Sequence, residues 1–400
     1  MKKILVMIMA VMMVVSLAAC GNSTATDTSD TAATAAPAAT TAPVATEAAA
    51  TDTAVATTVT PGSYPAEKVI IGVEIYDPTD SEFLEMQKYF DYLAETINVE
   101  FKYSEAIKDA DGEMKFIEDC AMAGCKGFIA YYNVSGVEQV RTVIEYDMYY
   151  WGMAATKEVY DAYSSDPMYL GDVNTGNSDY EAGKAIGEWV LAQGFDTVVY
   201  ANGGADFGVA QFVSRQAGFT DALKDSTVNV ITVSGFPGDQ FFADQAAALG
   251  TEGLDAVCAS FNGLDFWAQP IASAGLDKTV KLATVGSLNQ NYVDAFGNGS
   301  VSFLAAANIQ RFGLAIGMIC NAVDGNADAL KADGLATNVN EDMWTFDNAE
   351  DCAALFAIQA NEKIFSVEDV LSLCKTINPS TSATTITDLV ESSKLENLLK

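Results

Sequence analysis

Apolar residues follow two alternating patterns along residues 68–174. Residues 69–75 form a largely apolar run, which is typical of a buried strand. The next apolar residues recur at three- and four-residue spacing and predict a helix through Phe83, Met86, Phe90, Leu93 and Ile97. The same alternation predicts strands at 99–103, 127–132, 148–153 and 167–173, with helices at 112–123 and 137–146. Strands that alternate with helices favour a parallel sheet covered on both faces.

A second series of the same kind begins after a polar joint at 174–178. Its predicted strands are 197–201, 228–233, 254–260 and 281–285, and its predicted helices are 179–192, 209–223, 239–249, 265–274 and 290–296. A strand at 302–307 and a helix at 311–323 are expected to return the chain to the first series. Residues 343–400 add a short strand at 344–346 and helices near Cys352 and Val367.

These patterns predict an α/β protein with two doubly wound parallel-sheet lobes joined by a hinge. The first lobe is expected to comprise residues 66–174 and about 308–330. The second is expected to comprise residues 175–307 and about 331–400, including a C-terminal extension.

The first 65 residues have a different composition. Lys2 and Lys3 precede an apolar segment at 4–15, and Leu17-Ala18-Ala19 leads to Cys20. This arrangement resembles a bacterial lipoprotein signal peptide covering residues 1–20, which implies lipidation of Cys20; the alternative is an ordinary secretory signal with an incidental cysteine. Residues 21–65 are rich in Thr and Ala and contain few large apolar side chains, which favours a disordered tether. We therefore expect a lipid-anchored protein on the outer face of the bacterial cell membrane.

Charge and composition restrict the possible partners and chemistry. The 400-residue chain has a formal net charge of -33, which argues against binding to nucleic acid and favours a soluble monomer. It contains no histidine, which excludes histidine bases and histidine metal ligands. No motif for a metal or cofactor is found, and none is expected. The six cysteines after Cys20 are interpreted as small buried apolar residues, although one disulfide remains open.

Polar and aromatic side chains gather where the predicted strands end. In open α/β sheets, loops at the carboxyl ends of strands hold ligands. A neutral polar ligand such as a sugar needs planar groups for its hydroxyls and an aromatic face for its C–H side. The loops supply such a mixture: Asp77, Phe83, Asn133, Trp151, Asp206, Phe207, Asn262 and Asp265. Trp151 has core packing as its alternative role.

Four segments carry a resemblance to a known family. They are IGVEIYDPTDSEF at 71–83, SDYEAGK at 178–184, VSRQAGF at 213–219 and VGSL at 285–288. Their order is similar to that in the type I, ribose-binding-like substrate-binding lipoproteins of bacterial ABC importers. The resemblance implies a ligand held in a cleft between two lobes that close about a hinge.

The resemblance also implies roles for particular residues. It places Asp77, Phe83, Asp179, Arg215 and Asn262 at ligand-binding positions. The alternative role of Arg215 is to form a salt bridge, and the alternative role of Asp179 is to stabilise a helix N-terminus.

Two segments depart from the pattern of the sugar binders in this family. Residues 151–155 lack the usual Asp-Arg pair, and residues 286–289 lack the usual aspartate, so that Asn289 is the candidate there. These differences argue against a simple pentose or hexose.

The expected function is capture of a small polar, carbohydrate-like ligand and its delivery to an ABC permease, without enzymatic activity. Alternatives with the same fold are a nucleoside or autoinducer binder, or a sensor domain. A carboxylate-dependent glycoside hydrolase is the alternative of a different class, since paired acids suffice for that reaction.

Overall fold

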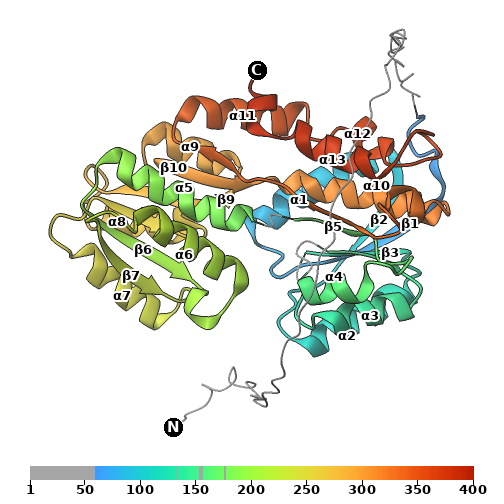
Figure 1. Cartoon of the computed structure of the whole chain (residues 1–400), viewed down its shortest axis with the longest axis horizontal. Helices are drawn as coiled ribbons and strands as arrows, with labels where there is room; N and C mark the ends of the chain where they lie inside the picture. The colour runs from blue at the N-terminus through green and yellow to red at the C-terminus, as the bar shows by residue number, and fades with distance from the viewer. Residues whose placement is uncertain (1–58, 132, 153–155, 175–176) are drawn as a thin grey trace, which may run out of the picture. The chain divides into compact units, whose positions relative to one another are not determined.

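The computed structural model describes residues 59–131, 133–152, 156–174 and 177–400 (Figure 1). The expected signal peptide, Cys20, residues 21–58 of the tether and residues 153–155 lie outside this part of the chain. The first strand, β1 (Tyr64–Glu74), begins two residues before the expected start of the fold, and Tyr64 is buried. The boundary of the tether at residue 65 is therefore corrected to lie before Tyr64.

The first lobe contains a four-stranded parallel sheet in the order β2-β1-β3-β4. Its other strands are β2 (Ile97–Tyr103), β3 (Gly127–Ala130) and β4 (Tyr149–Gly152). Its helices are α1 (Ser81–Ala94), α2 (Ala110–Met122), α3 (Val137–Glu145) and α4 (Lys157–Tyr163). Residues 71–74 of β1 are all buried, although their side chains alternate between the two faces, as expected for a central strand covered by helices on both faces.

The second lobe contains a six-stranded sheet in the order β12-β10-β9-β8-β6-β7. Its strands are β6 (Thr197–Gly203), β7 (Asn229–Ser234), β8 (Ala256–Ala259), β9 (Lys281–Ser287), β10 (Phe303–Ala307) and β12 (Trp344–Phe346). Its helices include α5 (Ser178–Gln193), α6 (Ala210–Leu223), α7 (Asp239–Leu249), α8 (Gln269–Ser273) and α9 (Gln290–Asn298). The edge strand β12 runs antiparallel to β10, whereas an all-parallel sheet was expected.

Before the C-terminal extension, three segments lead from an element of one lobe to an element of the other. The first connection leads from β5 (Gly171–Asn174) to α5, and the second leads from β10 through the short helix η3 (Ile309–Arg311) into α10 (Phe312–Val323). The third leads from β11 (Thr337–Asn340) to β12. Since β11 pairs with β5, which adjoins β4 through a bridge between Tyr150 and Tyr169, it belongs to the first lobe. This corrects the expectation that all of residues 331–400 join the second lobe.

The C-terminal extension packs on both lobes (Figure 1). It consists of α11 (Ala349–Asn361), α12 (Val367–Ser372), α13 (Ala383–Ser392) and α14 (Leu395–Leu398). Helix α11 contacts α9 of the second lobe, whereas α12 contacts α10 of the first. Gly317 of α10 allows the close approach of α12, because a Cβ there would lie 2.3 Å from the carbonyl oxygen of Val370.

Within the described residues, no helix has the length and apolar character needed to cross a membrane. The six described cysteines are all buried free thiols, which confirms their interpretation as small core residues.

Candidate functional site

Arg215 of α6 and Asp179 of α5 form a partly buried ion pair. Arg215 Nε and Nη2 both reach Asp179 Oδ1, at 2.8 and 2.7 Å, and the two side chains are 12% and 11% exposed. Arg215 Nη1 also donates to the carbonyl oxygen of Ser260, at 2.7 Å, at the end of β8. The structure therefore contains the salt bridge that was considered for Arg215, and it ties two helices to a strand end.

Two glycines bring the backbones of α5 and α6 together. A Cβ at Gly183 would lie 1.9 Å from the carbonyl oxygen of Arg215, and one at Gly218 would lie 2.0 Å from that of Tyr180. Larger residues at these positions would push the helices apart. The position of Arg215 thus depends on close helix packing.

The loop after β6 presents Asp206 and Phe207 to the surface. Asp206 accepts a hydrogen bond of 2.5 Å from the Ser234 hydroxyl. This bond, with a smaller effect of the nearby Asn202 amide, lowers the pKa of Asp206. Phe207 is 71% exposed. Asn202 is fully buried.

Four phenylalanine rings line the same edge of the second sheet. The rings of Phe212, Phe236 and Phe261 pack edge to face, with centroids 5.5 to 5.7 Å apart. Phe266 adds a fourth ring 5.8 Å from Phe261. Because Phe236 is 47% exposed, this aromatic cluster can cover the apolar face of a ligand.

Asn262 and Asp265 lie beside this aromatic cluster. The backbone of Asn262 has a φ of 33°, and its carbonyl oxygen accepts from the N–H of Asp265 at 3.1 Å. Asp265 lies in a short π-helix, Leu264–Ala268, where α8 was expected to begin. Although much of its side chain is exposed, partial burial raises the pKa of Asp265, and the carboxyl group of Asp80 adds to this effect.

The candidates of the first lobe have structural contacts. Asp77 Oδ1 accepts from the N–H and hydroxyl of Thr79 at 2.8 and 2.7 Å. Asn133 exchanges hydrogen bonds of 2.5 and 3.1 Å with the backbone of Gly136. Phe83 is 4% exposed and belongs to the core, with its ring centroid 5.4 Å from that of Tyr103. Asp77 and Asn133 thus stabilise the loops after β1 and β3.

Trp151 and Asn289 also contact other residues of the protein. Trp151 is fully buried, with its ring centroid 5.4 Å from that of Phe312. Asn289 caps α9, where its Oδ1 accepts from the N–H groups of Asn291 and Tyr292 at 2.9 and 3.3 Å.

Asn289 also lines a cavity of about 400 Å³ between the lobes. The other lining residues belong to α1 and to the start of α9: Ser81, Leu84, Glu85, Gln87, Lys88, Asp91, Gln290 and Asn291. The described residues contain no cluster of acidic or cysteine side chains that could hold a metal ion.

A polar group that sequence reasoning missed links the two lobes. Glu82, in the first turn of α1, lies near Ser287 at the end of β9 and near Arg311 in the second connection. Burial raises the pKa of Glu82, while Arg311, Ser287 and Tyr131 act in the opposite direction. Arg311 and Ser287 are 2% and 4% exposed. Arg311 Nε has no hydrogen-bond partner within the described part of the chain, whereas the Ser287 hydroxyl interacts with the Glu82 carboxyl group.

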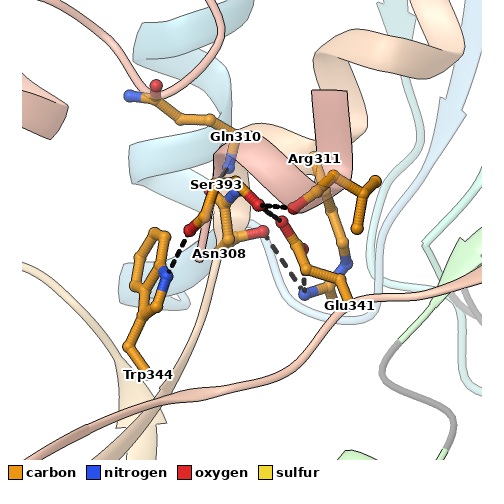
Figure 2. Close-up of polar contacts among 7 residues, drawn as sticks. Asn308, Gln310, Arg311, Glu341, Trp344 and Ser393 are labelled. Atoms are coloured by element: carbon orange, nitrogen blue, oxygen red, sulfur yellow. Dashed lines mark hydrogen bonds and ion pairs between the residues drawn. The ribbon is translucent and has the colours of Figure 1, made fainter. Parts of the chain in front are cut away.

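The second and third connections meet in one buried hydrogen-bond network (Figure 2). Glu341 Oε1 accepts from Asn308 Nδ2 and from Ser393 Oγ, both at 2.8 Å. Arg311 Nη1 lies 3.9 Å from Glu341 Oε2, and Trp344 Nε1 donates to the carbonyl oxygen of Ser393 at 2.8 Å. The hinge is therefore joined to the residue that follows α13.

The chain matches no protein-family model, and no curated protein matches it in sequence. Solved structures, however, share its fold. One is a Mycobacterium smegmatis protein in complex with β-D-fucofuranose (14% identity, TM-score 0.57, covering 76% of this chain and 98% of the other).

A second similar structure is the periplasmic binding protein of the arabinose ABC transporter from Shewanella sp. ANA-3, bound to L-arabinofuranose (16% identity, TM-score 0.57, coverage 75% and 98%). A third is an ABC transporter periplasmic solute-binding protein from Actinobacillus succinogenes with bound D-allose (12%, 0.58, coverage 70% and 97%). These similarities confirm the predicted fold, that of type I periplasmic binding proteins.

Proposed function

We propose that this protein is an extracytoplasmic solute receptor that binds a small, carbohydrate-like ligand between its lobes and delivers it to an ABC permease. The observation that carries the proposal is the group formed by Glu82, Ser287 and Arg311. It brings together the first turn of α1, the end of β9 and the hinge, and Arg311 Nε within it is buried without a hydrogen-bond partner among the described residues. Such an atom favours a polar ligand, because an unpaired buried donor is costly.

The aromatic cluster of Phe212, Phe236, Phe261 and Phe266 supports the same proposal. It lies at the carboxyl edge of the second sheet, where α/β folds bind ligands. Aromatic rings cover the C–H face of a sugar, and hydroxyl and carboxyl groups bind its hydroxyls. The three similar structures described above hold sugars, which makes furanose and pyranose sugars the first ligands to test.

A thermal-shift screen tests the proposal. L-arabinose, D-fucose, D-allose, D-galactose, nucleosides and amino acids are added separately to the purified chain. A ligand at about 100 times its Kd should add about 2.7 kcal/mol and raise Tm by several degrees. Turnover of chromogenic glycosides in the same samples would instead favour a hydrolase. If no sugar raises Tm, the carbohydrate proposal is wrong.

A nucleoside receptor is the second candidate. It is favoured by the size of the aromatic cluster and by the exposure of Phe207, since a flat base can stack on such rings. A Tm increase with nucleosides but not with sugars would support it. In either case, Arg215→Ala should abolish the shift in a folded protein if Arg215 also contacts the ligand.

Membrane attachment belongs to the same proposal and rests on the sequence around Cys20. Metabolic labelling with a radioactive fatty acid should modify the wild-type chain and leave Cys20→Ala unlabelled. The variant should be released from the membrane fraction. Equal membrane association of the two proteins would exclude lipidation as the anchor.

A further inference from the structure

Cys120 and Cys125 face each other at the C-terminal end of α2. Helix α2 ends at Met122, and Gly124 follows with a φ of 78° in the left-handed region. The N–H of Cys125 donates to the carbonyl oxygen of Cys120 at 3.0 Å, and the N–H of Gly124 donates to that of Ala121 at 3.0 Å. These two bonds define a Schellman motif.

The Schellman motif decides which side chains meet. It brings the residue two positions after the helix cap into contact with the residue three positions before it, usually as an apolar pair. Here those two positions are Cys125 and Cys120, which are 4% and 0% exposed and belong to the same apolar cluster. A disulfide requires Cα atoms about 4.4–6.8 Å apart, and the backbone hydrogen bond between Cys120 and Cys125 holds their backbones close together.

The two thiols influence each other, which lowers the pKa of Cys125 and raises that of Cys120. Cys125 also lies at the edge of the fold, between exposed Gly124 and exposed Lys126. The geometry thus places two buried thiols side by side, with Cys125 flanked by exposed residues.

We propose that Cys120 and Cys125 are a disulfide-forming pair, oxidised by thiol–disulfide exchange with a small-molecule disulfide or with a disulfide oxidoreductase. The Cys125 thiolate attacks one sulfur of the oxidant, forms a mixed disulfide and expels the other sulfur as a thiolate. Cys120 then loses its proton to solvent and attacks the Cys125 sulfur, which expels the second thiolate. The protein loses two hydrogens as two protons and two electrons, and the oxidant is reduced to two thiols.

The proposal does not depend on which ligand the protein binds. The sequence predicts that these residues are inert core thiols, whereas the proposal is that they form a disulfide with each other. Cys258 and Cys352 lack this helix-end geometry and serve as internal controls.

Peptide mass spectrometry of the full chain tests the proposal. Trypsin cleaves after Lys115 and Lys126 and releases both cysteines in one peptide, FIEDCAMAGCK. The folded protein is incubated with oxidised glutathione, denatured in acid and alkylated with iodoacetamide before digestion. We expect the peptide to be lighter by two hydrogens and to carry no alkyl group, whereas the control cysteines are alkylated. Dithiothreitol before alkylation should restore two alkylation sites.

Single substitutions test the order of attack. Cys120→Ser removes the second thiol, so Cys125 should accumulate as a stable mixed disulfide with glutathione. Cys125→Ser should form at least tenfold less of that adduct at Cys120, and Cys258→Ser should oxidise like the wild-type protein. If the wild-type peptide keeps two alkylatable thiols after oxidation, the proposal is overturned. This result is measured on the wild-type protein and therefore does not depend on the folding of any variant.

Discussion

Asn308 and Glu341 lie on two different connections between the lobes, and Asn308 Nδ2 donates a hydrogen bond of 2.8 Å to Glu341 Oε1. Ser393 donates to the same oxygen from the residue after α13, and Arg311 lies 3.9 Å from the other oxygen (Figure 2). A single buried carboxylate therefore joins two parts of the hinge with the C-terminal extension. This relationship gives the extension a structural role, because its end holds the hinge network in place.

Glu341→Ala should be strongly destabilising. The substitution leaves Arg311 buried without its closest described carboxylate and removes the acceptor of Asn308 and Ser393. Loss of one partner of a buried pair costs about 3–5 kcal/mol, which urea denaturation can measure. The neighbouring exposed residue provides the control, since Asp342→Ala should change the free energy of unfolding by about 0.5 kcal/mol or less. Equal effects of the two substitutions would contradict this role of Glu341.

Arg215 and Asp179 should be energetically coupled. Arg215→Ala leaves a carboxylate with 11% exposure without its ion-pair partner and should reduce the free energy of unfolding by about 3 kcal/mol. Arg215→Lys should recover only part of this loss, because a lysine cannot form the same set of directed bonds. In a double-mutant cycle with Asp179→Ala, the double variant should lose less stability than the sum of the single variants. Additive losses would show that the pair contributes no coupling energy.

The sequence predicts the repeating elements of both lobes because each central strand is an apolar run. Residues 69–74 of the predicted 69–75 strand, for example, lie within β1, and the predicted 281–285 strand lies within β9. The sequence does not predict β11, because Thr337–Asn340 contains a single large apolar residue, Val339, and forms a strand by pairing with β5. Such pairing between distant segments leaves no local periodicity.

The candidate site was likewise predicted only in part. Polar residues at strand ends were correctly located in the chain, but local contacts already occupy several of them. Asn289, for example, caps α9, and Asp77 binds Thr79. Conversely, Glu82 and Arg311 were not predicted, because they become neighbours only when the second connection returns the chain to the first lobe. The one signal in the sequence for this pair is Arg311 itself, a charged residue at the start of the apolar helix predicted at 311–323.

A buried acidic pair in the first lobe should make stability depend on pH. Glu74 and Glu113 are fully buried, and Gln139 Nε2 donates to both, at 2.6 and 2.8 Å. Burial, together with the adjacent Glu113, raises the pKa of Glu74 to about 10. The folded protein then holds a proton that the unfolded chain releases near pH 4.5. Stability should therefore fall as pH rises from about 5 toward 10.

Glu74→Gln tests this dependence. The amide cannot release a proton, so Tm should fall less steeply between pH 5 and pH 9 than in the wild-type protein. At pH 9 the variant should be the more stable of the two. Glu113→Gln is the comparison: it weakens the acceptor for the N–H groups of Val134 and Ser135, which lie 2.7 and 3.0 Å away, and should destabilise at every pH. An unchanged slope in Glu74→Gln would mean that another group titrates.

Ser287→Ala should separate ligand binding from folding. Ser287 is 4% exposed, and its hydroxyl lies near the Glu82 carboxyl group. Since the substitution removes at most one weak hydrogen bond to Glu82, the free energy of unfolding without ligand should change by less than about 1 kcal/mol. If the hydroxyl binds ligand, its loss should cost about 0.5–1.5 kcal/mol of binding, which corresponds to an increase of up to tenfold in Kd.

Calorimetric titration with the sugar that gives the largest Tm shift measures this change in Kd for Ser287→Ala. The matched control is Ser300→Ala, at an exposed serine beyond α9, which should leave both Kd and stability unchanged. Unchanged affinity in Ser287→Ala would exclude the hydroxyl as a ligand contact. A loss of stability that equals the loss of binding would instead assign Ser287 to the packing of β9. Only weaker binding with intact stability places this serine in the site.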